Sequence, residues 1–315
     1  MIYIGIDIGG TQVKIGLVNA EGIVELVSAY DVAFDNYDTP IIETVKKRLV
    51  EFAQANNLEE NQIAGIGVSA TGQIDVKNGV VIGAAGHIKN WQGCRIKEEI
   101  KSIYSVPVSV MNDANCAAVA EQWIGGSKGI SDSVMITVGT GVGGGVIVNS
   151  EILCGNGGGA GELGHLTIRN NGVKCSCGNR GCYEQYASTT ALVKMVKQCV
   201  RKGAISSDVF ADGVINGRTI FAGIEHDAAL KQCVKKWIGF VADGLVGLIH
   251  TFDPEIVLIG GGVSAQQEYF IKPLREQILS RVMPEYAKRV KIEAATSGNN
   301  AGMIGAVYYC MKHGN

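Results

Sequence analysis

The sequence predicts an α/β protein made of two similarly built halves with a cleft between them. Segments 4–18 and 134–148 align without a gap, and each reads as a strand, a glycine turn and a second strand. A third apolar stretch, 256–262, is a strand that also ends in a glycine turn. Any two such hairpins look alike, but each is followed by further strands and helices, which favours a duplication.

The first half is expected to hold strands and helices in alternation. The hairpin 2–18 continues into a third strand near 23–29, and further strands are expected at 63–70 and 106–113. Thr39 followed by Pro40 predicts a helix that runs to about Asn56, with the threonine as its cap. A second helix is expected at 114–124.

The second half begins with the hairpin at 134–148, and helices are expected at 189–202, 227–251, 265–280 and 301–311. The last of these helices is expected to return to the first domain. We therefore predict a smaller N-terminal α/β domain of residues 1–118 plus 300–315. A larger α/β domain of residues 119–299 follows, with hinges near 114–125 and 297–301.

The composition is that of an ordinary soluble globular protein, with 46% hydrophobic and 18% charged residues among 315. A net charge of −2 argues against a nucleic acid or a membrane as the main partner. No secretory signal or membrane span is visible, and nine cysteines, an odd number in a large chain, favour metal binding over disulfides. The cytoplasm is the expected location.

The first glycine turn is a candidate phosphate site. Asp7 ends a strand, backbone amides and Thr11 follow in the turn, and Lys14 comes next. Such a turn can hold phosphates through its N–H groups, while Asp7 holds Mg²⁺ through water. A plain hairpin turn, with Lys14 as an exposed strand residue, is the alternative.

The second glycine turn, GTGVGG at 139–144, fits a dinucleotide fingerprint only weakly, because it continues as a strand instead of opening a helix. A Walker A loop is absent as well. The prediction is therefore a phosphate clamp between two hairpins, which includes Gly141. Gly260, Gly261 and Gly262 would form a flat surface for a nucleoside.

His165, Cys175, Cys177 and Cys182 suit one tetrahedral Zn²⁺. Four protein ligands leave no open position for water, so the zinc is expected to be structural. It would fix the loop that carries Glu162 and Glu184, two acceptors suited to sugar hydroxyls. Each glutamate alone would be an ordinary surface residue.

Asp113 follows Asn112 where a strand is expected to meet a helix, and its carboxylate could take a proton from a substrate hydroxyl. A simple Asn-Asp helix cap is the alternative for this pair.

The motifs DIGGTQVK, NDANCAA, TVGTGVGGG, GELGH, CSCGNRGCYE and LIGGG span nearly the whole chain. Together they resemble the ROK family of bacterial sugar kinases and repressors. The resemblance implies an actin-like ATPase fold, related to ribonuclease H, whose two domains close over ATP-Mg²⁺ and a hexose.

The resemblance implies roles for particular residues. Asp113 is expected to be the catalytic base toward the sugar's 6-hydroxyl, and His165 is expected to touch the sugar as well as the zinc. The implied sugar contacts are Gly72, Asn112, Asp113, Glu162, His165 and Glu184, with Asn90 in GHIKNWQG as a weaker candidate. The implied phosphate contacts are Gly9, Gly10, Thr11, Lys14, Thr137, Gly139 and Thr140.

The expected activity is ATP-dependent phosphorylation of a hexose at the 6-hydroxyl, with glucose favoured. The alternatives are a kinase for N-acetylmannosamine, another hexose or a β-glucoside, and a non-catalytic sugar-binding sensor. Repressors of the family carry a winged helix-turn-helix ahead of DIGGT, and here that motif starts at residue 7, which favours the enzyme. A homodimer is expected from the resemblance.

Overall fold

The computed structural model describes residues 2–83, 88–210 and 213–314. The chain divides into two compact units. Unit 1 holds residues 1–129, 145–161 and 296–315, and unit 2 holds residues 130–144 and 162–295. No helix in the described part of the chain is both long enough and apolar enough to cross a bilayer.

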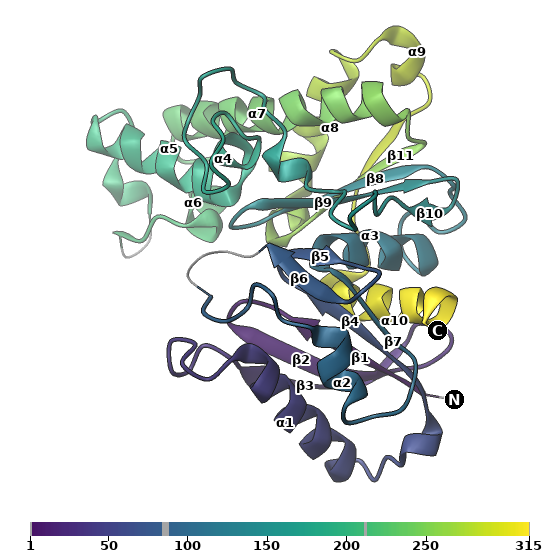
Figure 1. The fold of residues 1–315 in the computed structure, drawn as a ribbon. Helices are drawn as coiled ribbons and strands as arrows, with labels where there is room; N and C mark the ends of the chain where they lie inside the picture. The colour runs from purple at the N-terminus through teal and green to yellow at the C-terminus, as the bar shows by residue number, and fades with distance from the viewer. Residues whose placement is uncertain (1, 84–87, 211–212, 315) are drawn as a thin grey trace. The chain divides into compact units, whose positions relative to one another are not determined.

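Unit 1 is built on a five-stranded sheet in the order β3-β2-β1-β4-β7 (Figure 1). β1 pairs antiparallel with β2 and parallel with β4, and β4 pairs parallel with β7. The strands are β1 (Ile2–Ile8), β2 (Gln12–Val18), β3 (Val24–Asp31), β4 (Ile63–Ala70) and β7 (Val108–Asn112), with a separate hairpin of β5 (Gln73–Asp75) and β6 (Val80–Gly83). The helices are α1 (Ile41–Ala55), α2 (Ile96–Lys101), α3 (Asp113–Trp123) and α10 (Ala301–His313).

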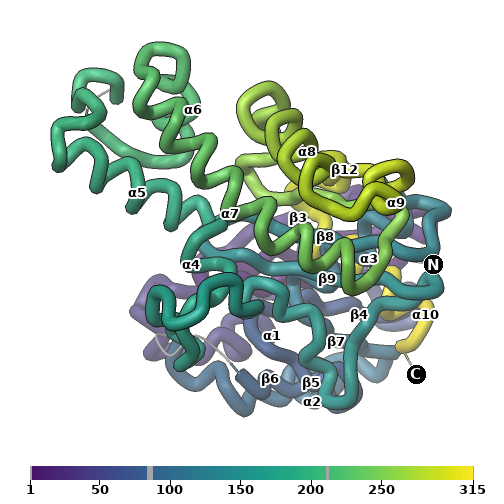
Figure 2. The backbone as a smooth tube through the Cα atoms, turned by 90° about the horizontal axis from the view of Figure 1, so that it is seen from above, coloured from purple at the N-terminus to yellow at the C-terminus, as the bar shows by residue number. Residues whose placement is uncertain are grey.

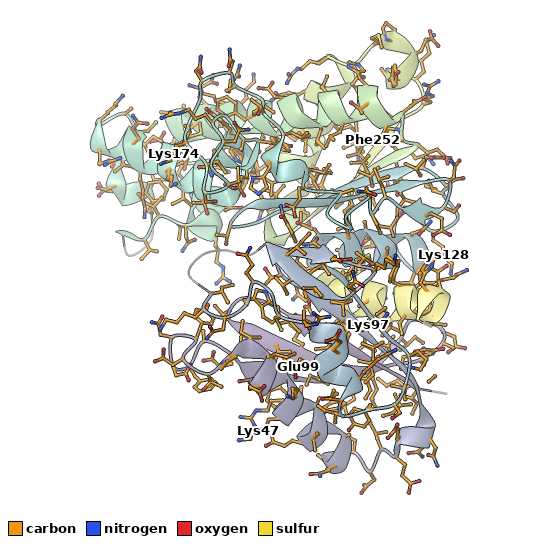
Figure 3. The ribbon with its side chains drawn as sticks, viewed as in Figure 1. Lys47, Lys97, Glu99, Lys128, Lys174 and Phe252 are labelled. Carbon is orange, nitrogen blue, oxygen red and sulfur yellow. The ribbon has the colours of Figure 1, made fainter. Side chains whose placement is uncertain are left out.

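The two faces of this sheet follow from the alternation of side chains along its strands. Ile4 and Ile6 of β1 lie in one hydrophobic cluster with Leu49 of α1 and Ile100 of α2. The intervening Gly5 faces α10 so closely that an added Cβ would lie 2.1 Å from Met303. Helices therefore cover both faces. On one face, Lys46 of α1 donates at 2.8 Å to Glu99 of α2, which is labelled in Figure 3.

A second five-stranded sheet has the order β10-β9-β8-β11-β12. Its strands are β8 (Ser133–Val138), β9 (Val142–Val148), β10 (Glu151–Ile152), β11 (Ile256–Gly260) and β12 (Lys291–Ala294). β8 occupies the central position that β1 has in the first sheet. Its neighbours β9 and β11 correspond to β2 and β4, the hairpin partner and the parallel neighbour of β1. The duplication predicted from the two glycine hairpins is thus present in the topology.

The helices of unit 2 are α4 (Glu184–Ala187), α5 (Thr189–Arg201), α6 (Gly217–Gly223), α7 (Ala228–Phe252), α8 (Lys272–Leu279) and α9 (Pro284–Ala287). α7 runs beside α8 in both views (Figures 1 and 2). Trp237 of α7 is fully buried and stacks on Phe270, which precedes α8, with ring centroids 4.9 Å apart. Such a buried aromatic pair contributes both apolar burial and a preferred ring geometry.

Two details differ from the sequence prediction. Pro40, and not Thr39, is the N-cap of α1, and its side chain has no acceptor with which to make a cap bond. Thr39 donates its backbone N–H to Asp35 Oδ2 at 2.9 Å. The single helix expected at 265–280 is divided into a 3₁₀ turn, a π-helical turn (Gln267–Ile271) and α8. Pro273 has no N–H with which to continue a regular ladder across this junction.

Candidate functional site

The turn between β1 and β2 presents Asp7 at the end of its strand. The Asp7 carboxylate accepts a hydrogen bond from the Ser69 hydroxyl at 2.7 Å and lies 3.9 Å from the Lys14 ammonium. Burial raises the pKa of Asp7, while Ser69 and Lys14 act in the opposite direction. Lys14 also donates to the carbonyl of Asn299 at 2.9 Å. Lys14 is thus held in this unit and is not a free surface residue.

Replacing Asp7 by asparagine is expected to raise the melting temperature at neutral pH. A raised pKa means that the folded state disfavours the charged carboxylate, so this charge costs stability above the group's unfolded pKa. An amide has nearly the same shape without that charge. Thermal unfolding at pH 7 checks this, with Asp31→Asn at an exposed position as the control. A lower melting temperature for Asp7→Asn than for the control would contradict the account.

Asn112 and Asp113 stand at the junction of β7 and α3. Asn112 is the N-cap, since its Oδ1 accepts from the N–H groups of Ala114 and Asn115 at 2.9 and 3.2 Å. The helix cap that was the alternative for this pair is therefore confirmed for Asn112. Its Nδ2 donates to the carbonyl of Gly72 at 2.9 Å, which leaves one amide hydrogen for a further partner. Asp113 is the first helical residue, and its Oδ1 accepts from Ala114 N at 2.8 Å.

The segment after β4 contains Gly72 and is hydrogen-bonded both to Asn112 and to Trp91, the neighbour of Asn90. The carbonyl of Thr71, next to Gly72, accepts from the buried indole of Trp91 at 2.9 Å. Asn90 precedes that indole and is exposed, with a φ of +57°. Of the GHIKNWQG segment, Gly86 and His87 lie outside the described residues. The structure thus places Gly72, Asn112 and the neighbour of Asn90 in one hydrogen-bonded group.

The carboxylates of Asp7 and Asp113 both act on the buried thiol of Cys116. Burial raises the pKa of Cys116 well above its ordinary value, and the negative charges of Asp7 and Asp113 both add to this shift. The sheet register agrees with this: Asp7 pairs with Ser69, and Ser69 pairs with Met111, two residues before Asp113. The predicted magnesium residue and the predicted base therefore lie in one region of unit 1.

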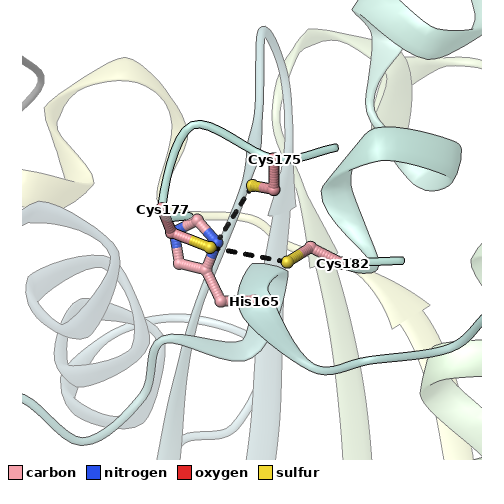
Figure 4. Close-up of side chains that lie close together, drawn as sticks. All are labelled: His165, Cys175, Cys177 and Cys182. Carbon is pink, nitrogen blue, oxygen red and sulfur yellow. Dashed lines mark hydrogen bonds between the residues drawn. The ribbon is translucent and has the colours of Figure 1, made fainter. Parts of the chain in front are cut away.

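The four predicted zinc ligands of unit 2 come together (Figure 4). Their ligand atoms all lie within 4.8 Å of one another. Cys175 Sγ is 3.7 Å from His165 Nδ1, and Cys177 Sγ is 3.6 Å from Cys182 Sγ. Tetrahedral zinc with about 2.3 Å bonds to sulfur would place two sulfurs about 3.8 Å apart, so the spacing fits. The N–H of Asn179 lowers the pKa of the Cys177 thiol, which favours a thiolate ligand.

Backbone geometry explains how so short a loop closes. Gly178 and Gly181 have φ values of +94° and +81°, in the region that favours glycine. A Cβ at Gly181 would lie 1.7 Å from the carbonyl oxygen of Arg169. The loop is further held by isolated bridges between residues 167 and 182 and between residues 174 and 180.

The two predicted glutamates lie against this loop. Glu162 has an oxygen 3.9 Å from His165 Nε2, and burial raises its pKa, with His165 lowering it and Glu184 raising it further. Glu184 is the first residue of α4, and its Oε1 accepts from Cys175 Sγ at 3.3 Å. Both carboxylates therefore depend on the loop for their positions, and neither is a plain surface residue.

The second glycine turn lies against the same group within unit 2. A Cβ at Gly141 would lie 2.7 Å from Glu184 Oε2, and the carbonyl of Gly139 accepts from Thr189 N at 2.9 Å. Thr137 pairs in register with Gly260 across β8 and β11. The structure thus brings the predicted phosphate turn, Glu184 and the metal loop together.

A pocket of about 580 Å³ opens beside this turn and lies wholly in unit 2, a size that suits a small ligand. Three predicted nucleotide residues line it: Gly139, Thr140 and Gly262. Gly260 is buried below the surface, and Gly261 is exposed but does not line the pocket. The other lining residues were missed by sequence reasoning: Val138, Thr189, Thr190, Val193, Asn216, Gly217, Arg218, Phe221, Val263 and Gln266.

Gly261→Ala is expected to destabilise the protein by about 1–3 kcal/mol. The φ of Gly261 is +89°, and an added Cβ would lie 2.2 Å from the carbonyl oxygen of Val138, which lines the pocket. Gly247→Ala in α7 is the matched control, since its Cβ would meet nothing within 4 Å. Chemical denaturation of both variants checks this, and equal stability of the two would contradict it.

The two sheets of equal strand order define the class of this protein: it has the actin-like ATPase fold. A model of the ROK family matches residues 3–313, and the chain belongs to that family. It is 31% identical to a glucokinase of Halalkalibacterium halodurans, over 99% of this chain and 96% of the relative. A crystal structure of a ROK family glucokinase from Streptomyces griseus in complex with glucose and AMPPNP matches with a TM-score of 0.84 at 30% identity. That match covers 99% of this chain and all of the other. A xylose repressor of Caldicellulosiruptor bescii is 30% identical, over 96% of this chain and 76% of the repressor.

Proposed function

We propose that this protein transfers the terminal phosphoryl group of ATP to the 6-hydroxyl of a hexose, with glucose favoured. The observation that carries the proposal is the position of Asp113. It stands at the end of β7 and the start of α3, and β4 pairs both with β7 and with β1, the strand that carries Asp7. The glucokinase similarity over nearly the whole chain supports the same reaction.

In this proposal Asp113 accepts the proton of the sugar hydroxyl as that oxygen attacks the phosphorus. The amides of Gly9, Gly10, Gly139 and Gly141, with Thr11, Lys14, Thr137 and Thr140, would hold the phosphates. Asp7 would hold Mg²⁺ through water. Phosphoryl transfer needs little covalent chemistry from the protein, so catalysis is mostly positioning and neutralisation of charge.

The proposed sugar contacts are drawn from both units. Unit 1 contributes Gly72, Asn90, Asn112 and Asp113, and unit 2 contributes Glu162, His165 and Glu184. A structural zinc on His165, Cys175, Cys177 and Cys182 would keep the unit 2 carboxylates in place, since Glu162 lies three residues before His165 and Glu184 lies two residues after Cys182. In the same unit, the 580 Å³ pocket would take the nucleoside of ATP beside Gly262, the member of the predicted 260–262 glycine surface that lines it. The domain limits 1–118 plus 300–315 and 119–299, the homodimer and the cytoplasmic location also stay predictions.

The specific observation that favours a second function is the similarity to a xylose repressor. A sugar-binding sensor would need the sugar contacts but no base and no phosphate turns. Asp7, Asp113 and the 139–141 turn support the kinase over the sensor, because a sensor has no use for them.

A coupled assay for ADP formation, run over a panel of hexoses, 2-acetamido hexoses and β-glucosides, tests the proposal and identifies the sugar. We expect turnover with glucose above all other members of the panel. Preferred turnover of N-acetylmannosamine or a β-glucoside would keep the kinase and change the substrate. Tight sugar binding without any ADP formation would instead support the sensor.

A further inference from the structure

Glu121, on the last turns of α3, is a buried carboxylate that the proposed reaction does not use. Its side chain is 0% exposed, and among the described residues it is the one charged side chain in the buried interior. A carboxylate without water is costly unless hydrogen-bond donors surround it. The hydrogen-bond partners of Glu121 therefore explain how a carboxylate is stabilised at this buried position.

Four donors surround this carboxylate. Oε1 accepts from the backbone N–H groups of Thr296 and Ser297 at 2.8 and 2.6 Å. Oε2 accepts from the N–H of Gly126 at 2.6 Å and from the Thr296 hydroxyl at 3.2 Å. An ionised carboxylate only accepts hydrogen bonds, so it matches donors on both of its oxygens in a way that an amide cannot.

These donors belong to two stretches of chain that are distant in sequence. Gly126 precedes Lys128 (labelled in Figure 3) and the point after residue 129 where the chain first leaves unit 1. Thr296 is the residue at which the chain returns to unit 1 for the last time. The chain also passes between the units after residues 144 and 161, so Glu121 holds the first and the last of four crossings. All of its partners lie in unit 1.

The atoms around the Glu121 carboxylate are closely packed. A Cβ at Gly125 would lie 2.3 Å from Glu121 Oε2 and 2.6 Å from Ser297 Oγ. Glycine at position 125 therefore allows the two stretches and the carboxylate to meet. The N–H of Gly125 also donates to the carbonyl of Glu121 at 3.0 Å, which continues the helix into the first crossing.

We propose that Glu121 is a positioning residue that joins the first and last crossings into one pivot, so that the chain leaves unit 1 and returns to it beside one carboxylate. This role rests on the proposed kinase function, in which water must be excluded from the reacting phosphate. A shared pivot restricts the unit movements to those that both crossings allow. Loss of the pivot should therefore raise the hydrolysis of ATP by water relative to transfer to sugar.

Two variants separate this role from simple folding. Glu121→Gln keeps the side-chain volume but replaces one carboxylate oxygen by an NH₂ group. That group cannot accept from the backbone N–H donors that face it, so either Gly126 or the Thr296–Ser297 pair loses its hydrogen bond. Gly125→Ala keeps the carboxylate and displaces it by the added Cβ. Glu60→Gln is the control, since Glu60 also accepts a backbone N–H within unit 1, from Ser105 at 2.7 Å, far from either crossing in sequence.

The first measurement is hydrogen exchange on the ligand-free full chain. We expect amide exchange in 125–130 or 295–299 to accelerate about tenfold to a hundredfold in Glu121→Gln, the effect of losing a hydrogen bond to a charged group. Gly125→Ala should accelerate exchange in both segments, and Glu60→Gln in neither. Unchanged exchange at both crossings in Glu121→Gln and Gly125→Ala would overturn the proposal.

The second measurement compares ADP formation with phosphorylated glucose formed in the same reaction. We expect the ADP produced without sugar phosphate to rise about tenfold in both variants, with the control like the wild type. Faster amide exchange at the crossings with an unchanged ratio of ADP to sugar phosphate would show that Glu121 only stabilises the fold. That result would overturn the positioning role. If the wild type transfers no phosphate to any sugar, the proposed function has failed, and the exchange measurement still decides whether Glu121 joins the crossings.

Discussion

Asp113→Asn is expected to reduce phosphate transfer by about 100- to 10,000-fold while leaving sugar binding largely unchanged. An amide cannot accept the proton that the sugar hydroxyl releases, but it keeps the shape of the side chain. It also keeps an oxygen that can accept from Ala114 N, as Asp113 Oδ1 does at 2.8 Å. The start of α3 should therefore fold as before. ADP formation measures transfer, and calorimetric titration with glucose measures binding.

The control for this variant is Asp31→Asn, at the exposed end of β3. It changes the net charge equally and should leave transfer at the wild-type rate. Turnover retained within a few-fold in Asp113→Asn would refute the assignment of the base. Loss of transfer together with loss of sugar binding would show that Asp113 mainly holds the substrate.

Cys177→Ser is expected to remove the metal and to weaken sugar affinity about tenfold or more, since partners that orient a site typically act at this scale. Serine is a poor zinc ligand, and the remaining three groups cannot complete a tetrahedral site. Glu184 lies two residues after the proposed ligand Cys182, so a loosened loop should displace a proposed sugar contact. Elemental analysis of the purified protein should give about one zinc per wild-type chain.

Cys94→Ser is the matched control for the metal loop. Cys94 is partly buried in unit 1, outside the metal cluster, and burial raises the pKa of its thiol to about 12, so it is an unreactive cysteine. Its zinc content and sugar affinity should equal those of the wild type. Wild-type protein that is free of metal and fully active would remove the proposed ordering role of zinc.

Much of the fold could be predicted because its turns carry local signals. The glycine turns after Asp7 and Thr137 interrupt apolar strands, and the sheets show the expected hairpins there. The metal loop was also predictable, because its ligands lie within 18 residues and its glycines adopt positive φ. In both cases the residues that interact are close in sequence.

The parts that sequence reasoning missed depend on contacts between distant segments. Arg218 and Phe221 line the 580 Å³ pocket from α6, about 80 residues after the glycine turn, and nothing in their local pattern indicates a ligand. Glu121 looks like an exposed helical glutamate in the sequence, yet it is buried by bonds to residues 175 and 176 positions away. Tertiary structure, and not local pattern, determines these roles.

The most direct test of the account follows phosphorus by ³¹P NMR while the purified protein turns over glucose, ATP and Mg²⁺. We predict one new phosphate monoester on the 6-oxygen for each ADP formed, and its formation at least about 100-fold slower with Asp113→Asn. A monoester on another oxygen, or ADP and free phosphate alone while glucose is bound, would contradict the claim that Asp113 delivers the primary alcohol of a hexose to ATP.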